Sequence, residues 1–333
     1  MRRVLVPGRI AARQPPLGVV HTLAGQSMGT AWSVRLAGAA RMDLQALEAG
    51  IQRELDLIVA QMSHWEPGSD LSRFNRAKAG TWMALPAPFM EVLQYARSVA
   101  ADSGGAYDPG AGALVDLWGF GAHGRHGEPG FQPPDEAAIA AACGHCGWQR
   151  LRLDSAGGRA WQPGELRLDL SAVAKGYAVD RIARHLDEAG IQDHLVEVGG
   201  ELRGTGIKPD GQPWWVQLEP LDGLDSDTVL ALHGLCVATS GDYRRYFQHA
   251  GRRHPHTIDP RSGRPIAHGL ARVTVLHAQC MAADALSTAL TVLGPEAGFE
   301  WAMQRGLAAL FVTRRPQGGF DERMTPACEA LAQ

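Results

Sequence analysis

HLVEVGGELRGTG, His194 to Gly206, is the stretch that decides the kind of fold. Two short apolar runs flank the pair Gly199 and Gly200, so the glycines join one predicted strand to another. A glycine-rich dinucleotide-binding motif would instead lead from a strand into a helix. A pair of β-turns explains the glycines equally well. The stretch therefore predicts two successive strands with no helix between them.

Strand candidates come in adjacent pairs on both sides of this stretch, and helices separate the pairs. A hairpin is predicted over 19–38 with its turn near 25–27, and strands at 148–154, 164–170, 214–220, 228–241, 271–278 and 307–314. Helices are predicted at 43–63, 86–105, 136–147, 168–183, 280–294 and 295–306. This order indicates an α+β fold with largely antiparallel sheets flanked by helices. We expect a flexible tail at 1–19, one compact body at 20–320 and a C-terminal tail at 321–333.

The composition limits the function classes. The chain has 333 residues, of which 45% are hydrophobic and 20% charged, as in soluble globular proteins. A formal net charge of −3, without a long Lys/Arg stripe, argues against nucleic-acid binding. No apolar run is long enough for a transmembrane segment. Residues 1–20 lack a continuous apolar core and a lipobox cysteine, so the sequence predicts no signal peptide and, by itself, a cytoplasmic location.

The cysteines and two loop histidines do not indicate a metal or redox site. Five scattered cysteines are unlike a disulfide framework. Cys143 and Cys146 have C-x-x-C spacing, but neither a second zinc-ligand pair nor a thioredoxin-like context accompanies them, so we interpret them as cysteines of a loop or helix end. His123 and His126, in the polar loop 121–136, are interpreted as solvated.

The predicted helix 280–294 carries oxygen donors on one face. Asp284, Ser287 and Thr288 lie at i, i+3 and i+4, which places their side chains together, and a separate stripe of leucines can pack on the core. A carboxylate with hydroxyls, without His or Cys, suits a hard cation such as Mg²⁺. An Asp cap with Ser and Thr bonded back to helix carbonyls is the alternative.

Lys175 is unusual because it lies near the predicted start of a helix. That end carries partial positive charge, where a cation is disfavoured and an anion is favoured, so Lys175 suggests that a strongly negative group binds there. The alternative for Lys175 is a solvated lysine on the helix surface. The alternative for Asp169 is a simple N-cap of this helix. Trp65, Tyr107 and Trp118 could stack on a planar ring or belong to the core.

Eight sequence blocks, none of them specific alone, occur in one order between Ser27 and Gly294. They are SMGT, DLSRFN, YDPGAGALVDLWGFG, DLSAVAKGYAVD, VEVGGELRGTG, ATSGDYRRYF, HTIDPRSGRPI and ADALSTALTVLG. In this combination the chain closely resembles the ApbE family, the FAD:protein FMN transferases, over about four fifths of its length. The resemblance implies an ApbE-like (T-fold-like) single body with a central cleft.

The resemblance also implies site residues. The metal ligands would be the backbone carbonyl of Ala172 and the side chains of Asp284, Ser287 and Thr288. The FAD contacts would be Met28, Trp65, Ala106, Tyr107, Asp108, Asp169, Lys175 and Ile258. His256, Thr239 and Asp242 belong to blocks that would line the same cleft. Trp65 departs from the tyrosine common in the family, and the missing export signal departs from members that are exported lipoproteins.

The implied reaction is Mg²⁺-dependent transfer of FMN from FAD to a Thr or Ser hydroxyl of an acceptor flavoprotein, with release of AMP. Lys175 and the metal would neutralise the diphosphate, and Asp169 would orient the flavin or ribityl part. Asp284 or His256 could accept the hydroxyl proton, and His256 has the more suitable ordinary pKa. An Mg²⁺-dependent FAD pyrophosphatase, a non-catalytic FAD-binding protein and a redox flavoenzyme are the alternatives.

Overall fold

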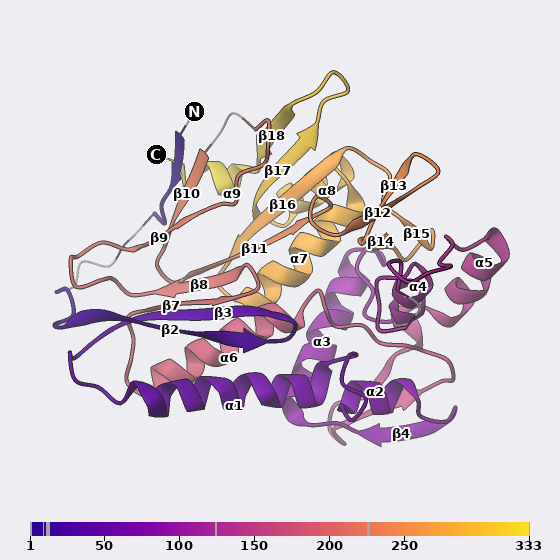
Figure 1. Cartoon of the computed structure of the whole chain (residues 1–333), viewed down its shortest axis with the longest axis horizontal. Helices are drawn as coiled ribbons and strands as arrows, with labels where there is room; N and C mark the ends of the chain where they lie inside the picture. The colour runs from indigo at the N-terminus through magenta and orange to yellow at the C-terminus, as the bar shows by residue number, and fades with distance from the viewer. Residues whose placement is uncertain (1, 9, 11–13, 124, 225–226, 333) are drawn as a thin grey trace.

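The computed structural model describes residues 2–8, 10, 14–123, 125–224 and 227–332. Its main element is an eight-stranded antiparallel sheet with the order β18-β17-β16-β11-β8-β7-β3-β2 (Figure 1). The strands are β2 (Val19–Ser27), β3 (Thr30–Gly38), β7 (His194–Val198), β8 (Glu201–Thr205), β11 (Leu235–Gly241), β16 (Leu270–His277), β17 (Ala308–Arg314) and β18 (Phe320–Met324). The expected α+β class with largely antiparallel sheets is confirmed.

The opening stretch forms the hairpin of β7 and β8. Val198 pairs with Glu201, so Gly199 and Gly200 make the two-residue turn, with φ of 63° and 104°. Positive φ at both turn residues matches the twist of a hairpin, and glycine adopts it without a steric penalty. The turn places Glu201 at the start of β8, directly beside the cleft described below.

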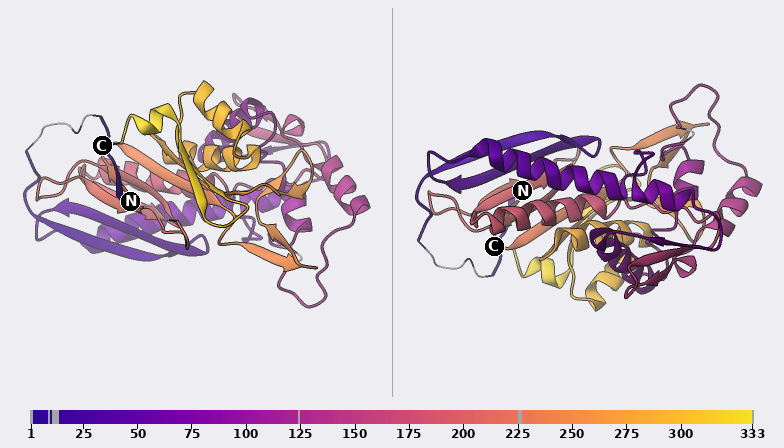
Figure 2. Two further views of the ribbon diagram at one scale, coloured as in Figure 1. Left: turned by 90° about the horizontal axis from the view of Figure 1, so that it is seen from above. Right: turned by 90° about the horizontal axis from the view of Figure 1, so that it is seen from below.

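Helices cover one face of the large sheet. They are α1 (Leu44–Met62), α6 (Ala174–Glu188) and α7 (Cys280–Leu293), with α1 and α6 side by side (Figure 2). Along β16, Val273 and Val275 belong to the core shared with these helices, whereas Leu276 belongs to the core on the opposite face. This alternation follows from the pleat of a strand that is buried on both faces.

A three-stranded sheet covers the opposite face. Its order is β1 (Arg2–Leu5), β10 (Asp227–Leu232), β9 (Trp214–Gln217), and β1 runs parallel to β10. Leu5, Trp214 and Leu230 pack there in one buried cluster with Val237 and Leu310 of the large sheet. The small sheet therefore closes the second apolar core of the molecule.

The remaining elements gather around one end of the sheet (Figure 1). They are α2 (Asp70–Asn75), β4 (Thr81–Ala84), α3 (Ala87–Asp102), α4 (Gly112–Leu117), α5 (Glu136–His145), a 3₁₀ turn (Trp148–Arg150), β5 (Arg152–Asp154), β6 (Arg159–Gln162), β12 (Tyr246–His249), β13 (Arg252–Pro255), β14 (Ile258–Asp259), β15 (Arg264–Pro265) and α8 (Ala297–Gln304), while α9 (Pro326–Glu329) lies beside β17 and β18. Within the described ranges, no helix has the length and apolar character needed to cross a membrane.

The structure differs from the expected tails. Leu5, expected in a flexible N-terminal tail, is buried in β1, and β18 and α9 extend the fold beyond the expected boundary at residue 320. The N-terminal segment has a backbone partner in a sheet, since β1 pairs with β10. The two terminal segments also bond each other, since Val6 N donates to the carbonyl of Leu331 at 2.7 Å. The sequence of β18 is FDERM, with three consecutive charged residues between two apolar ones, as suits an edge strand, and this weakened its signal in the sequence.

Three local predictions were also wrong. The strand expected at 164–170 lies earlier, at β6, because Arg159–Gln162 pairs with both β4 and β5. The first hairpin turns at Met28 and Gly29, not at 25–27, because Ser27 still pairs with Thr30. The helix expected over 168–183 begins at Ala174, which places Lys175 in its first turn.

Helices α6 and α7 are fastened to each other at the centre of the molecule. Both carboxylate oxygens of Asp180 in α6 accept hydrogen bonds from α7, Oδ1 from Cys280 N at 3.0 Å and Oδ2 from Met281 N at 2.9 Å. These N–H groups have no partner within their own helix, so Asp180 acts as a cap supplied by a neighbour. Gly176 lets the helices approach closely, because a Cβ there would lie 2.3 Å from the carbonyl oxygen of Cys280.

Candidate active site

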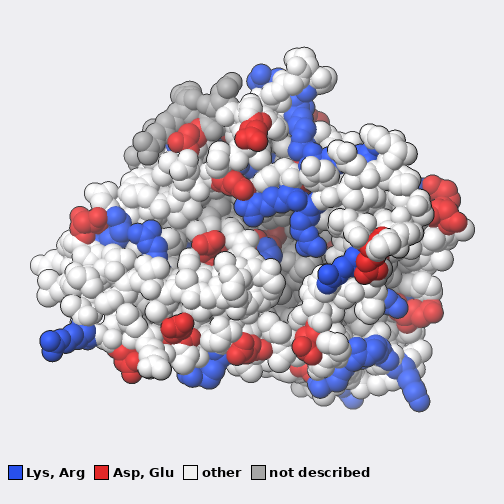
Figure 3. All heavy atoms as spheres, viewed as in Figure 1, with Lys and Arg blue, Asp and Glu red and all other residues white. Residues whose placement is uncertain are grey.

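A cavity of about 1590 Å³ opens where α6, α7 and β11 meet the β2–β3 turn and the loops after α3. Its mouth is the hollow near the middle of the face in Figure 3, with blue arginine and lysine side chains around it. Twelve of the thirteen metal, FAD-contact and base residues expected from the sequence line it: Met28, Trp65, Ala106, Tyr107, Asp108, Asp169, Ala172, Lys175, His256, Ile258, Asp284 and Thr288. Positions far apart in the sequence therefore share one cavity.

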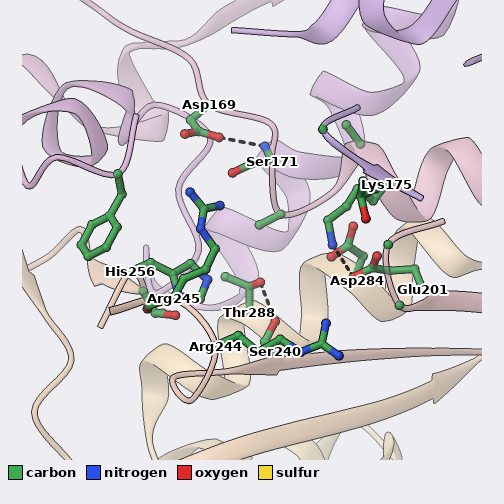
Figure 4. Close-up of a pocket in the computed structure, with 18 of the residues that line it drawn as sticks. Asp169, Ser171, Lys175, Glu201, Ser240, Arg244, Arg245, His256, Asp284 and Thr288 are labelled. Atoms are coloured by element: carbon green, nitrogen blue, oxygen red, sulfur yellow. Dashed lines mark hydrogen bonds and ion pairs between the residues drawn. The ribbon is translucent and has the colours of Figure 1, made fainter. Parts of the chain in front are cut away.

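Lys175 lies between two buried carboxylates. Its Nζ is 2.5 Å from Oε1 of Glu201, and Asp284 adds a second negative charge nearby (Figure 4). Burial alone would lower the pKa of Lys175, but the two carboxylates outweigh it and the pKa is raised. Lys175 therefore stays charged at the wall of the cavity, in the first turn of α6.

Glu201 is a site residue that sequence analysis missed. Its side chain is buried, and its Oε2 has no hydrogen-bond partner. Burial raises its pKa to about 7, with Asp284 acting in the same direction and Lys175 in the opposite one. The signal in the sequence was its place directly after a two-glycine turn, which brings the start of β8 under Lys175.

Asp284 is held from the side of α6. Its Oδ2 accepts a hydrogen bond from Gly176 N at 2.9 Å. Burial raises its pKa, while Lys175 and the Gly176 N–H favour the ionised form. The close approach of the helices at Gly176 therefore orients this carboxylate toward the cavity.

The hydroxyl groups of α7 divide between two environments. Thr288 lines the cavity, and its Oγ1 lies 3.0 Å from Oγ of Ser240 in β11. Ser287 is fully buried and does not line the cavity, since its Oγ donates to the carbonyl of Asp284 at 2.9 Å and contacts Ser240 Oγ at 2.8 Å. The expected common face of Asp284, Ser287 and Thr288 is therefore incomplete, and Ser240 is a neighbour that sequence analysis missed.

The three oxygen donors do not share one open face because α7 is buried on almost every side. Besides Leu293 near its end, Thr288 is its only residue that is not classed as buried. The sequence suggested one apolar and one polar face, but sheet, α6 and cavity surround the helix. The i, i+3 spacing of Asp284 and Ser287 consequently brings the serine into a packed interface, where it bonds back to the helix, as the capping interpretation allows.

His256 has a defined tautomer. Its ring Nδ1 lies 3.1 Å from the carbonyl oxygen of Arg245, so Nδ1 carries the proton and donates. Burial, and then the Arg245 guanidinium, lower its pKa to about 4. At neutral pH the ring is therefore uncharged and its Nε2 carries a lone pair, as a general base requires.

Asp242 does not belong to the site. It accepts two hydrogen bonds from Arg314, at 2.8 and 2.6 Å, and does not line the cavity. Thr239 does line it and bonds Thr274 through their hydroxyls at 2.9 Å. Asp242, directly after β11, is thus held by Arg314 at the end of β17, while Thr239 and Ser240 of the same sequence block line the cavity.

Trp65, Tyr107 and Asp108, three of the predicted flavin contacts, also line the cavity. Trp65 is 45% exposed, and the Arg125 guanidinium lies 4.6 Å from its ring centre. Tyr107 is buried with an unpartnered hydroxyl, and Asp108 accepts hydrogen bonds from Gly110 N and Trp148 N. Burial raises the pKa of Asp108 to about 6. An aromatic face and buried polar atoms therefore lie along one wall.

Asp169 and Trp118 have structural partners. Oδ1 of Asp169 accepts from Ser171 N at 2.8 Å, which forms an Asx turn before α6 instead of an N-cap. Asp169 still lines the cavity (Figure 4). Trp118 is buried, donates to the carbonyl of Gly263 and does not line the cavity. Of the three aromatic candidates, Trp65 and Tyr107 remain in the site.

The C-x-x-C pair and His123 do not line the cavity, whereas the loop histidine His126 does. Cys143 and Cys146 are both free, and burial raises the pKa of Cys146 to about 12, which makes it a poor nucleophile. His123 lies beside Asp116, while His126 stacks on Phe247 at the cavity. In the described part of the chain no three His, Cys, Asp or Glu side chains form a metal-binding group.

The donor set at the α6–α7 end fits a hard cation. Ala172, Asp284 and Thr288 all line the cavity there, and they offer a carbonyl, a carboxylate and a hydroxyl oxygen. A magnesium ion takes few protein ligands and completes its octahedron with water and phosphate oxygens. The residues present are therefore compatible with Mg²⁺.

Comparison with known proteins identifies the family. A family model described as the ApbE family matches residues 28–311. A curated FAD:protein FMN transferase of Klebsiella pneumoniae (strain 342) is 35% identical, covering 97% of this chain and 93% of the relative. The apo crystal structure of Pseudomonas stutzeri flavinyl transferase ApbE is 38% identical, with a TM-score of 0.86 and coverage of 97% and 98%.

A second solved structure, the flavin transferase ApbE from Vibrio cholerae, is 32% identical with a TM-score of 0.85, and it covers 94% of this chain and 99% of its own. Relatives and solved structures thus match nearly the whole length, and the range matched by the family model includes the site residues expected from the sequence. The chain therefore belongs to the ApbE family.

Proposed function

We propose that this chain is an FAD:protein FMN transferase that moves FMN from FAD to a Thr or Ser hydroxyl of an acceptor flavoprotein and releases AMP. The observation that carries the proposal is the convergence of Lys175, Asp284, Thr288 and His256 on one cavity with the aromatic wall at Trp65. Together they provide a cation, oxygen donors for a metal and an uncharged base. Relatives named as FAD:protein FMN transferases support the same reaction.

Asp284, Thr288 and the carbonyl of Ala172 are the proposed Mg²⁺ ligands. Ser287, which the resemblance also implied, does not line the cavity, and its Oγ donates to the carbonyl of Asp284. When bound, Mg²⁺ supplies Lewis-acid neutralisation of phosphate charge. Lys175 binds the diphosphate as a fixed cation, held by Glu201. Trp65 stacks on the flavin ring, and Asp169 orients the flavin or ribityl part.

His256 is the proposed base. Its Nε2 accepts the proton as the acceptor hydroxyl oxygen bonds to the phosphorus on the FMN side. The bond between that phosphorus and the bridging oxygen breaks, and AMP leaves with the electron pair. Asp284 is less suited to this step, because its carboxylate is engaged by Gly176 N and is a proposed metal ligand.

Three variants of α7 test the proposal. Each is incubated with FAD, Mg²⁺ and an acceptor flavoprotein, and the acceptor is followed by in-gel flavin fluorescence. We expect Asp284→Ala to abolish the fluorescent acceptor, Thr288→Ala to reduce it strongly, and Ser287→Ala, the matched control, to retain more activity than either. Full labelling by Asp284→Ala would refute the metal assignment.

The wild-type reaction separates the alternatives. Free FMN with AMP and an unlabelled acceptor would indicate a pyrophosphatase, because water would have replaced the hydroxyl. Unchanged FAD bound to the protein would indicate a flavin-binding protein. An FMN adduct on Thr or Ser, found by mass spectrometry of the acceptor, is the expected result.

A further inference from the structure

Arg245 is an exposed arginine that lines the active-site cavity. The other basic side chains around it are engaged: Arg244 pairs with Glu219, Arg125 lies over Trp65, and Lys175 pairs with Glu201. Within the described part of the chain, the Arg245 guanidinium makes no hydrogen bond or ion pair, although the residue lines the cavity. An unpaired guanidinium at the open wall of a cavity is suited to binding an anion.

The backbone of Arg245 is fixed beside the proposed base. Its carbonyl oxygen accepts from His256 N at 3.0 Å and from His256 Nδ1 at 3.1 Å. From this anchor the side chain extends across the cavity toward Ser171, on the side opposite Lys175 and Asp284 (Figure 4). The guanidinium and Lys175 therefore approach the space between them from two directions.

The positive charges near Lys175 do not balance the negative charges that would meet there when FAD is bound. Lys175 contributes one positive charge, and Glu201 and Asp284, when ionised, contribute two negative charges. A bound Mg²⁺ adds two positive charges, whereas the diphosphate of FAD carries two negative ones. One negative charge then remains without a partner, and the departing AMP phosphate gains more as the bridging bond breaks.

We propose that Arg245 is a catalytic residue whose guanidinium binds the diphosphate of FAD from the side opposite Lys175 and stabilises the phosphate of the departing AMP. This rests on the proposed function. The acceptor oxygen forms the new bond to the FMN phosphorus, the bond to the bridging oxygen breaks, and the electron pair goes to the AMP phosphate, where Arg245 neutralises it. The proton of the hydroxyl goes to Nε2 of His256.

Arg245→Gln tests this role, with Arg245→Lys as the conservative variant. The matched control is Arg252→Gln, which removes the same charge from an exposed arginine of β13 that does not line this cavity. We expect Arg245→Gln to lower kcat for acceptor labelling by about 100-fold, as loss of one transition-state donor does. Arg245→Lys should recover part of the rate, and Arg252→Gln should match the wild type.

The thermal stability of Arg245→Gln, compared with its kcat/KM, distinguishes a catalytic role of Arg245 from a structural one. Because the Arg245 guanidinium has no hydrogen bond or ion pair to the residues that the structure describes, the thermal unfolding midpoint of Arg245→Gln should equal that of the wild type. A kcat/KM within threefold of the wild type, or a loss of rate that follows a lower unfolding midpoint, would overturn the proposal.

AMP binding tests Arg245 without an acceptor. By calorimetry in the presence of Mg²⁺, Arg245→Gln should bind AMP at least tenfold more weakly than the wild type, and Arg252→Gln should bind it equally. Equal AMP affinity of Arg245→Gln and wild type would overturn the proposal. If the wild type labels no acceptor, the proposed function fails, yet the AMP comparison still decides whether Arg245 binds the phosphate.

Discussion

At the residue scale, His256 owes its chemistry to a single backbone contact. The hydrogen bond from Nδ1 to the carbonyl of Arg245 selects the tautomer, and burial beside a guanidinium keeps the ring uncharged. A histidine with its ordinary pKa near 6.5 would be partly protonated in slightly acidic solution. His256 should therefore remain able to accept a proton under conditions in which an exposed histidine could not.

The NMR signal of the His256 ring can be assigned as the histidine signal that is absent from the spectrum of His256→Asn. We expect this signal to keep the chemical shift of a neutral imidazole down to about pH 5. Because the folded-state pKa is about 4, the unfolded chain binds more protons between that value and 6.5. The free energy of unfolding should consequently fall as pH decreases through this range, and less steeply in His256→Asn. A ring that titrates near 6.5 would contradict the burial argument.

The site residues show what sequence can predict at this scale. Asp284, Thr288 and Lys175 were predicted because their spacing and helix position are visible in the chain, and the family blocks carried the remaining positions. Glu201, Ser240 and Arg245 were missed as site residues, because sheet pairing and an 11-residue connection bring them to the cavity. Ser287 and Asp242 do not line the cavity, although their sequence neighbours Thr288 and Gly241 do, because neighbours in sequence can face opposite sides of an element.

At the scale of elements, the contact between α6 and α7 depends on one small residue. A Cβ at position 176 would lie 2.3 Å from Cys280 O and 2.8 Å from Asp284 Cβ, so the helices would have to separate. Separation would also move the Gly176 N–H away from the Asp284 carboxylate.

Gly176→Ala should lower the free energy of unfolding by about 3 kcal/mol, because overpacking outweighs the better helix propensity of alanine. The matched control is Gly144→Ala in α5, where an added Cβ meets nothing within 4 Å. That change should raise stability by up to about 1 kcal/mol. Urea unfolding of both variants measures the difference, and equal effects would show that the interface has room for a methyl group.

The hairpin of β7 and β8 could be predicted because two glycines between apolar runs are a strong local signal. The strand at β6 could not, since its pairing with β4 joins residues 75 to 81 positions apart. Short helices such as α2 and α4 were also missed, because their six residues are too few to show a helical period.

At the scale of the whole molecule, the second core extends to the N-terminal segment. The sequence suggested a flexible tail there, because proline and arginine interrupt the apolar pattern of residues 1–19. Leu5 is nevertheless only 2% exposed, whereas Leu17 in the same segment is 93% exposed. The partner of β1 lies more than 220 residues away along the chain, so no local pattern could reveal the pairing.

Leu5→Ala should therefore lower the free energy of unfolding by about 2–3 kcal/mol, through lost burial and a residual cavity. Leu17→Ala, the control, should change it by less than about 0.5 kcal/mol. Chemical denaturation of the two variants provides the comparison. No difference between them would restore the view of this segment as a tail that contributes nothing to the fold.

Asp180 links these scales. Its carboxylate joins the first turn of α7 to the middle of α6, and Arg203 of β8 braces it at 2.9 Å. Lys175 in α6 and Asp284 in α7 therefore belong to one joined pair of helices, whose geometry is set while the protein folds. An incoming nucleotide would meet a preorganised receptor there, and the entropic cost of ordering that receptor would not be deducted from its binding affinity.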